Sequence, residues 1–211
     1  MCSSDLLQQT KTEGALTLQT TRQSTALLKI ETELTPNWTL TAFGSYTSLF
    51  LNQNDSNGAT PSQIALYGKN FALQNTDPSL PTYAPYNVTY KNTDMDYLRL
   101  KGNVAGSFTV DETLYTYAYV NKTFSPRSIL SKFNASHTTL SYTFGTKVNG
   151  TSFPNDIAGY TKLNAYRVWG SILRTAEDYQ FGPVSGQVRA GVWLESASTP
   201  RRRFDYDINK C

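Results

Sequence analysis

The sequence is poor in the residues that build disulfide frameworks, metal centres and phosphate-binding stripes. Its 2 cysteines, Cys2 and Cys211, lie at the ends of the 211 residues, which excludes a disulfide framework through the middle. The single histidine, His137, has no nucleophile or metal ligand near it, so we interpret it as a solvated loop residue. The net charge of +3 is too small to indicate a nucleic-acid partner, and Arg201–Arg203 is the only run of three basic residues along the sequence. We therefore expect no metal site, no cofactor and no nucleic-acid partner.

Long apolar runs and catalytic motifs are also missing. No run approaches the roughly eighteen apolar residues that a transmembrane helix needs, and the N-terminus lacks the basic start and apolar stretch of a signal peptide. The segment Asn52–Gly58 faintly resembles a calcium loop, but it lacks the closing Glu and is better interpreted as a polar surface turn. Because no residue set offers a mechanism, we expect that the protein is not an enzyme.

What the sequence does contain is tyrosine, threonine, asparagine and serine. Aromatic residues make up 13% of the chain, and 14 of them are Tyr. Tyr, Thr, Phe and Val suit pleated strands, whereas Asn, Asp, Gly and Pro collect in connections. The composition therefore predicts an all-β protein with long polar connections.

Alternation with a period of two predicts three hairpins. The clearest strand, Trp38–Phe50, places Trp, Leu, Ala, Tyr and Phe at even positions and mostly Thr and Ser at odd positions. We predict the following strand pairs and turns: Ser24–Leu34 with Trp38–Phe50 around Thr35–Asn37, Asp96–Val110 with Leu114–Thr123 around Asp111–Thr113, and Leu163–Thr175 with Val184–Ser198 around Asp178–Pro183. In Leu114–Thr123 three tyrosines oppose Leu114, and the sequence leaves open which of the two faces meets lipid.

Connection lengths alternate between short turns and two long irregular stretches, about residues 52–93 and 124–159. Loops of this length count against a compact soluble domain. Short periplasmic turns, long extracellular loops and aromatic girdles are typical of outer-membrane barrels, and twelve residues between Trp38 and Phe50 span roughly 30 Å in a tilted strand. We therefore predict an all-β antiparallel transmembrane β-barrel segment of about six long strands.

Two stretches resemble the barrel strands of TonB-dependent receptors. They are Asp94–Gly102 with Leu114–Tyr119, and Gly191–Glu195 followed by Arg201–Asp207. The resemblance implies a barrel closed by an N-terminal plug, which takes up ferric siderophores, cobalamin, haem or sugars with energy from the inner membrane. No plug or TonB-contacting segment is recognisable. We therefore expect residues 15–211 to be a partial barrel domain of a longer protein.

The opening residues carry a separate expectation. Cys2–Leu6 resembles the translation of a DNA-sequencing adapter, so we expect residues 1–14 to be either non-native or an N-terminal loop.

Together these features predict part of the wall of a TonB-dependent transporter in the cell outer membrane of a Gram-negative bacterium. Its partners would be outer-membrane lipid, a scarce small solute such as a ferric siderophore or another metal chelate, and TonB only through a missing N-terminal region. A passive porin-type barrel segment and a soluble extracellular β-sandwich binding domain remain alternatives.

Candidate ligand-binding residues fall into two groups. The loop aromatics present amphipathic rings, and their alternative role is packing against one another. Basic residues assigned to the lumen face could line a route for an anionic solute or pair with acids such as Glu195. The candidates are Tyr67, Phe71, Tyr83, Tyr86 and Tyr90 in the first group and Arg99, Lys101, Arg167 and Arg189 in the second.

Overall fold

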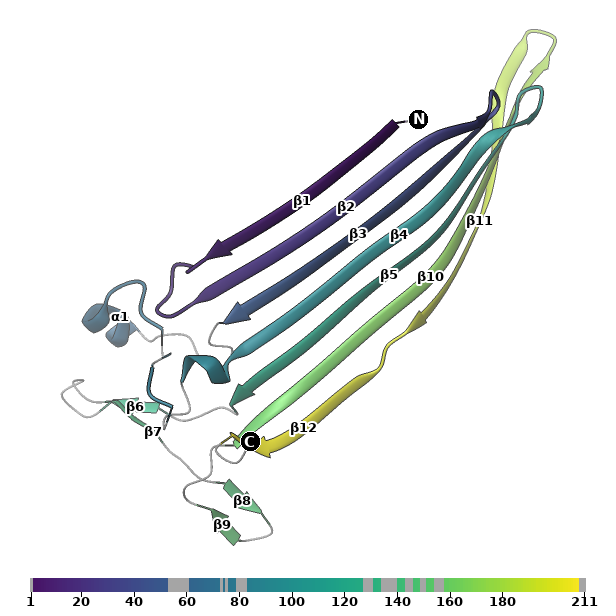
Figure 1. Ribbon diagram of the computed structural model, residues 1–211. Coiled ribbons are helices and arrows are strands. Elements are labelled where there is room, and N and C mark those ends of the chain that lie inside the picture. The colour runs from purple at the N-terminus through teal and green to yellow at the C-terminus, as the bar shows by residue number, and fades with distance from the viewer. Residues whose placement is uncertain are drawn as a thin grey trace.

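The computed structural model describes residues 2–52, 61–72, 74, 76–78, 83–126, 131–133, 140–142, 146–148, 151–153 and 158–208. Its main feature is one antiparallel sheet of eight strands in the order β1-β2-β3-β4-β5-β10-β11, with β12 paired to β10 (Figure 1). The strands are β1 (Cys2–Thr12), β2 (Thr20–Thr35), β3 (Trp38–Asn52), β4 (Val88–Ala105), β5 (Phe108–Pro126), β10 (Ala158–Phe181), β11 (Val184–Ser198) and β12 (Arg201–Asp207).

Smaller elements lie in the two long connections. They are α1 (Pro61–Tyr67), the 3-10 helix η1 (Ala84–Tyr86), and two short hairpins, β6 (Ser131–Phe133) with β7 (Leu140–Tyr142) and β8 (Thr146–Val148) with β9 (Thr151–Phe153). None of the helices in the described residues has the length and apolar character needed to cross a membrane. His137 and most of the segment Asn52–Gly58 lie outside the described residues.

The three predicted hairpins are confirmed, but the turn of the second was misplaced and that of the third is only Gly182–Pro183, since Asp178–Phe181 belongs to β10. The chain reverses at Gly106–Ser107, between Ala105 and Phe108, and not at Asp111–Thr113. Gly106 adopts a φ of +56°, which glycine reaches without steric cost. Asp111 instead continues β5 opposite Lys101. The triplet resembled a turn only in composition, since within β5 Asp111 points to the polar face and Glu112 to the apolar face.

Two strands beyond the expected six complete the sheet. Residues 2–12, for which a loop was one expectation, form β1 and pair with β2. At the other edge, β11 and β12 are one strand in a single register along β10, interrupted at Thr199–Pro200. The Ala165 N–H donates to the Pro200 carbonyl, but proline has no N–H to return the bond. The sheet is not closed, and β1 and β11–β12 are its two edges.

Register assigns every side chain of the sheet to one of two faces, because residues paired across strands point the same way. The apolar face contains Leu28, Ala42, Leu98, Leu114, Ser171 and Leu194 and their alternate neighbours. The polar face contains Thr41, Arg99, Thr113, Ile172 and Trp193 and theirs. Leu114 therefore shares the face of Leu98, and Tyr115, Tyr117 and Tyr119 point the other way.

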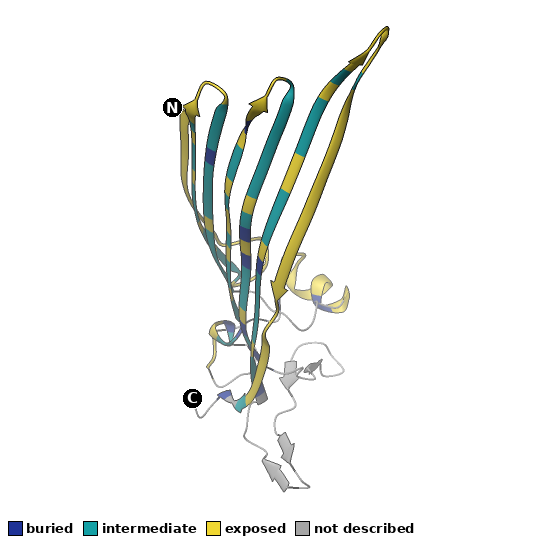
Figure 2. Cartoon of the chain, turned by 90° about the vertical axis from the view of Figure 1, so that its right-hand side faces the viewer, coloured by how far each residue is buried: buried dark blue, intermediate teal, exposed yellow. Residues whose placement is uncertain are grey.

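The sheet is a single layer without a packed core. The accessible surface is 13830 Å², whereas a compact protein of 23.5 kDa exposes about 9,800 Å². Among the described residues only Ala72, Ala84, Ala118, Val168 and Ile208 are buried and apolar. Figure 2 shows the consequence, with exposed residues along β11 and few buried ones among the residues that are coloured by burial. The apolar face is thus uncovered.

The short turns are staggered along the sheet. Trp38 begins β3 immediately after the first turn. The residues paired with it across successive strands form a row, which continues through Gly102 and Val110 to Thr175. Beyond that row β4 runs three more residues to Ala105, and β10 runs six more residues to Phe181. Each hairpin therefore reaches further than the one before, as in a sheet whose strands tilt around a barrel axis.

Gly102 gives a first test of this architecture. A Cβ on Gly102 would lie 2.4 Å from the backbone oxygen of Asn37 and 2.5 Å from the Trp38 ring. We expect Gly102→Val to lower the urea midpoint of the refolded chain by the equivalent of about 1–3 kcal/mol, since overpacking against backbone cannot relax easily. Gly106→Asn is the control, because that site is open and Asn tolerates positive φ. Equal midpoints for both variants would contradict the packing of Trp38 over β4.

Candidate functional site

A basic cluster lies on the polar face near the short turns. The Arg99 guanidinium donates two hydrogen bonds to Asp111, from Nε to Oδ1 at 2.7 Å and from Nη2 to Oδ2 at 2.5 Å. Asp111 has two register partners, Lys101 on β4 and Arg174 on β10. Three cationic side chains therefore surround one carboxylate, which leaves the cluster with a net positive charge.

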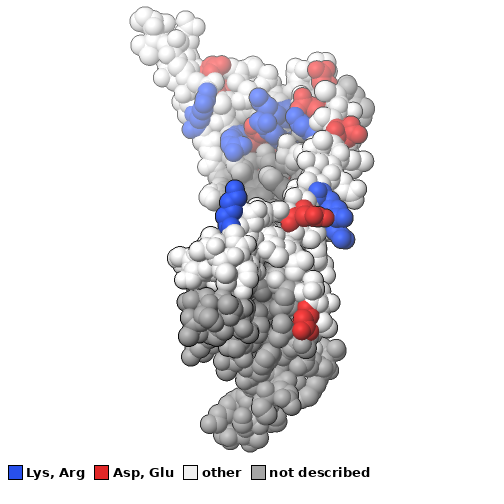
Figure 3. Space-filling view, turned by 90° about the vertical axis from the view of Figure 1, so that its left-hand side faces the viewer, with Lys and Arg blue, Asp and Glu red and all other residues white. Residues whose placement is uncertain are grey.

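Arg189 extends this cluster toward the sheet edge. It pairs with Ala176, two residues beyond Arg174, and its Nε donates to the Gln187 side chain. Gln187 in turn donates to Asp178 at 2.7 Å. We call Arg99, Lys101, Arg174 and Arg189 the basic cluster. In Figure 3 Lys and Arg side chains gather over the upper part of the sheet, with Asp and Glu beside them. Sequence analysis missed Arg174, because no register was available to place it beside Lys101.

Aromatic rings adjoin the basic cluster on the same face. Phe43 and Tyr97 stack with their centroids 5.0 Å apart, and Tyr115 and Tyr117 lie parallel at 6.5 Å. A Cβ on Gly170 would lie 2.2 Å from the Tyr115 ring, so glycine makes room for that ring against β10. These rings were also missed as site residues, although the alternation of tyrosines in β5 was visible in the sequence.

Polar bonds fix the orientation of Tyr115 within this aromatic band. The Trp193 indole N–H donates to the Tyr115 hydroxyl at 2.7 Å, and that hydroxyl donates to Glu195 at 2.6 Å. Glu195 is therefore held by Tyr115, and not by one of the predicted arginines.

The band and the basic cluster share a shallow hollow of about 430 Å³. It is lined by Met95, Tyr97, Arg99, Thr113, Tyr115, Tyr117, Ile172 and Arg174. A surface that combines stacked rings with guanidinium groups suits an anionic solute that carries flat or ring-shaped parts. This hollow is the strongest candidate for contact with a solute.

The predicted loop aromatics do not converge on one site. Tyr67 stacks on Phe71 at 4.6 Å, and Tyr83 contacts Tyr86 edge-on at 5.0 Å. Tyr90 lies on the apolar face of β4, 5.2 Å from the Phe50 ring. The rings therefore form separate local contacts and do not line one common surface.

Arg167 is not on the polar face, contrary to the prediction that grouped it with Arg99, Lys101 and Arg189. Its register partners are Ala118 and Ser198, which places it on the apolar face. There its Nη1 and Nη2 donate to the Asp94 carboxylate at 2.6 and 3.2 Å. The sequence could not reveal this, since the parity of β10 relative to β4 depends on two intervening turns.

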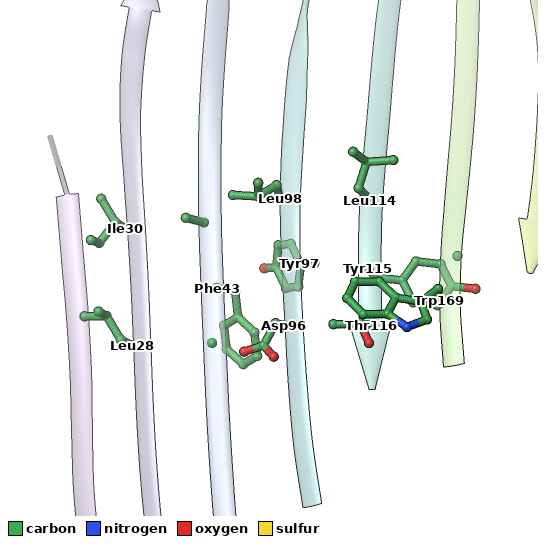
Figure 4. A pocket seen from close by; sticks show the side chains of 13 residues that line it. Leu28, Ile30, Phe43, Asp96, Tyr97, Leu98, Leu114, Tyr115, Thr116 and Trp169 are labelled. Carbon is green, nitrogen blue, oxygen red and sulfur yellow. The ribbon is translucent and has the colours of Figure 1, made fainter. Parts of the chain in front are cut away.

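An apolar groove of about 620 Å³ runs across the apolar face on the short-turn side of this ion pair (Figure 4). Leu28 and Ile30 flank one side, Leu98, Leu114 and Trp169 flank the other, and the small residues Ala42 and Gly44 lie between. Asp96 is the one carboxylate in its lining.

Comparison with known proteins does not assign the chain to a family. No family model and no curated protein matches the chain. Within the described residues, no three His, Cys, Asp or Glu side chains are grouped closely enough to hold a metal ion.

Tyr86 has a distinct electrostatic environment among the loop aromatics. Burial raises the pKa of its phenol above the ordinary 10.0, and the neighbouring Tyr83 raises it further. Its hydroxyl donates to the Pro78 carbonyl at 2.8 Å, a bond that the ionised form cannot make. The folded loop therefore favours the neutral phenol. This preference stabilises the folded state below pH 10, and the stabilisation is lost as the pH rises through the raised pKa.

We accordingly expect the Tyr86 resonance to titrate above 10 in a ¹³C-tyrosine NMR titration of the refolded chain. Tyr86→Phe identifies the resonance by removing it. Tyr83→Phe should reduce the pKa shift without abolishing it, because burial is the larger cause. A Tyr86 phenol that titrates at 10 or below would show that the loop does not cover it.

The Arg99–Asp111 pair allows a second test. Arg99 donates from both Nε and Nη2 to Asp111, whose side chain is only 16% exposed. We therefore expect a coupling energy of about 1 kcal/mol in a double-mutant cycle with Arg99→Gln and Asp111→Asn. Asp111→Asn should cost more than Arg99→Gln, since it leaves three cations facing one another. The exposed Arg203–Asp205 pair is the matched control and should show weaker coupling. Coupling near zero for Arg99–Asp111 would mean that the pair does not order the cluster.

Proposed function

We propose that this chain is part of the wall of an outer-membrane β-barrel transporter of the TonB-dependent type, which takes up a scarce solute such as a ferric siderophore in a Gram-negative bacterium. The observation that carries the proposal is the uncovered apolar face of a single-layer sheet. Leu98, Leu114 and Leu194 are 53%, 54% and 66% exposed on it. A contiguous apolar surface of this size marks a site of contact with another protein or with lipid.

The distribution of charge on that face favours lipid. Counted from the short-turn end of each strand, Glu112 and Glu177 lie four residues in. Asp96 lies nine residues from Ala105, and all the other charged residues of this face in β2–β11 lie further still. Between these two zones, over about 10 Å of depth, the face carries only uncharged residues, and deeper on the same face Asp94 and Arg167 neutralise each other by hydrogen bonding.

The stagger of the hairpins supports an outward apolar face. Strands in a barrel coil around its axis with a right-handed tilt, so an observer outside, with the long loops up, sees hydrogen-bonded rows rise toward the left. From β2 to β11 the short turns fall progressively further below each row, so the rows rise in that direction. Such an observer therefore has β11 on the left of β2.

Backbone stereochemistry then identifies the face that this observer sees. In an L-residue whose side chain points at the viewer, with its chain running upward, the N–H points to the right. Ala165 belongs to the apolar face, and its N–H points to β11–β12. Viewed from the apolar face with the short turns up, β11 is on the right, as in Figures 1 and 4. When the sheet is rotated in the plane of this view so that the long loops are up, β11 lies on the left. The outside observer thus faces the apolar side chains, and the polar face lines the interior.

This orientation assigns the hollow of the polar face to the pore. The basic cluster and the aromatic band would then line the route of an anionic, ring-bearing metal chelate. In hydrocarbon the exposed backbone groups of β1 and β11–β12 must be paired, so the proposal requires further strands at both edges. A passive porin-type wall is supported by the same strands and differs in needing no energised plug.

Spin labels provide the test. In a background of Cys2→Ser and Cys211→Ser, single cysteines at Leu98, Leu114 and Leu194 sample the apolar face, and those at Tyr97, Thr113 and Trp193 sample the polar face. We expect collision with lipid-dissolved oxygen to alternate with a period of two and to be highest at the first three sites when the chain is reconstituted in vesicles. A chain that is monomeric and cooperatively folded in buffer, without alternation in vesicles, would favour the soluble sandwich instead.

A further inference from the structure

A transverse row of basic residues crosses the apolar face near the long-loop end of the sheet. Register runs from Lys11 to Arg22 and on through the strands to Arg202. The row contains Lys11, Arg22, Phe50, Tyr90, Lys122, Leu163 and Arg202. We call Lys11, Arg22, Lys122 and Arg202 the basic row. Four cations in seven consecutive strand positions is a concentration of charge found in no other row of this face.

The strand positions around the basic row do not neutralise it. In this row and in the rows on either side, the apolar face of the described strands carries no Asp or Glu. The nearest acid on this face, Asp94, lies two rows away and is bonded by Arg167. All four side chains of the row are exposed. The row therefore presents uncompensated positive charge to whatever lies against the apolar face.

Aromatic rings accompany these charges. Arg22 lies over the Phe50 ring at 5.9 Å from its centroid, and Lys122 lies over Phe124 at 4.7 Å. Tyr90 contacts both rings. Cations mixed with amphipathic rings are typical of the interface between hydrocarbon and headgroups, where rings anchor the chain and cations contact phosphate.

The basic row is also at a suitable distance from the apolar groove. Gly44 in the groove and Phe50 in the row are six residues apart on β3, about 20 Å along the strand. This is comparable with half of a hydrocarbon core about 30 Å thick. A lipid whose phosphate lies at the basic row could thus place its acyl chain toward the groove. Adjacent strands are about 4.8 Å apart, so the row spans room for more than one phosphate.

We propose that the basic row binds the phosphate-bearing headgroups of anionic lipids in the leaflet on the long-loop side. The proposal rests on the proposed function, because it requires the apolar face to be outward. It commits to lipid over free phosphate because the groove and the interfacial rings lie on the same face as the cations. The polar face supplies a matched control at the same level: Lys91 and Lys162 each lie one residue from the basic row along their strands but point to the polar face.

The experiment compares partitioning into phosphatidylcholine vesicles with and without phosphatidylglycerol. Wild-type chain should prefer the anionic vesicles, and Arg22→Gln with Lys122→Gln should reduce that preference about tenfold or more, given what each interfacial cation contributes. Lys91→Gln with Lys162→Gln removes the same charge from the polar face and should reduce it by less than threefold. Arg22→Lys with Lys122→Arg keeps the charge and should retain the preference, which separates a loss of binding from a loss of folding.

The remaining outcomes distinguish the two proposals. Equal losses for both Gln pairs, or an anionic preference that survives Arg22→Gln with Lys122→Gln, would overturn the basic row while leaving the membrane proposal intact. Competition by inorganic phosphate beyond that of a salt of matched ionic strength would identify free phosphate as the ligand and overturn the lipid assignment. A chain that enters neither kind of vesicle would overturn the proposed function, and this inference with it.

Discussion

Every surface of this molecule depends on one hydrogen-bonded ladder that crosses the sheet from β1 to β12. Its register shifts only at Glu33/Thr35 and Asn103/Ala105, both next to short turns. Because side chains alternate strictly, a slip of one residue would exchange the two faces of every strand beyond it. Two bidentate ion pairs oppose such a slip: Arg99 with Asp111 on the polar face, and Arg167 with Asp94 on the apolar face. Both pairs involve β4 or its direct neighbour β5, in the middle of the sheet.

The same ladder explains how a layer without a core holds together. Its long strands replace layer-on-layer packing with backbone hydrogen bonds and with cross-strand side-chain pairs such as Phe43–Tyr97. The glycines at 102 and 170 contribute by letting Trp38 and Tyr115 lie flat against a neighbouring strand. Nothing on the apolar face balances the cost of leaving leucines in water. The surroundings of that face must therefore supply the stabilisation that a core supplies in a compact domain.

Sequence predicted the strands well because alternation is a local signal. Trp38–Phe50 lies within β3 nearly end to end, and all three hairpins are present. The sequence-based prediction failed where the face or position of a residue depends on the exact number of residues in a turn. Asp111–Thr113 resembles a turn in composition, yet Gly106 is the residue that the reversal requires. Arg167 was assigned to the wrong face for the same reason.

The candidate site was predicted only in part. Arg99, Lys101 and Arg189 were chosen correctly as residues of one face, whereas Arg174 and the ring of Tyr115 join them only through pairings between β5 and β10. Those two strands are separated by the long second connection, so no local pattern could have aligned them. Tyr67 and Phe71 were visible as loop aromatics, but a contact between rings does not distinguish packing from recognition.

Comparison of the two faces at one depth gives the strongest support for the orientation. Five to eight residues from the short turns, the apolar face of β2–β11 holds no charged side chain, as set out above. At that same depth the polar face holds Lys29, Arg99, Arg174 and Arg189, which lie six, six, seven and five residues from the ends of their strands. A soluble sheet has no reason to exclude charge from one zone of a face that water reaches. Within a bilayer, charge at this depth is tolerated only toward a water-filled interior. On the proposed orientation the basic cluster would face a water-filled interior, where its charge requires no desolvation.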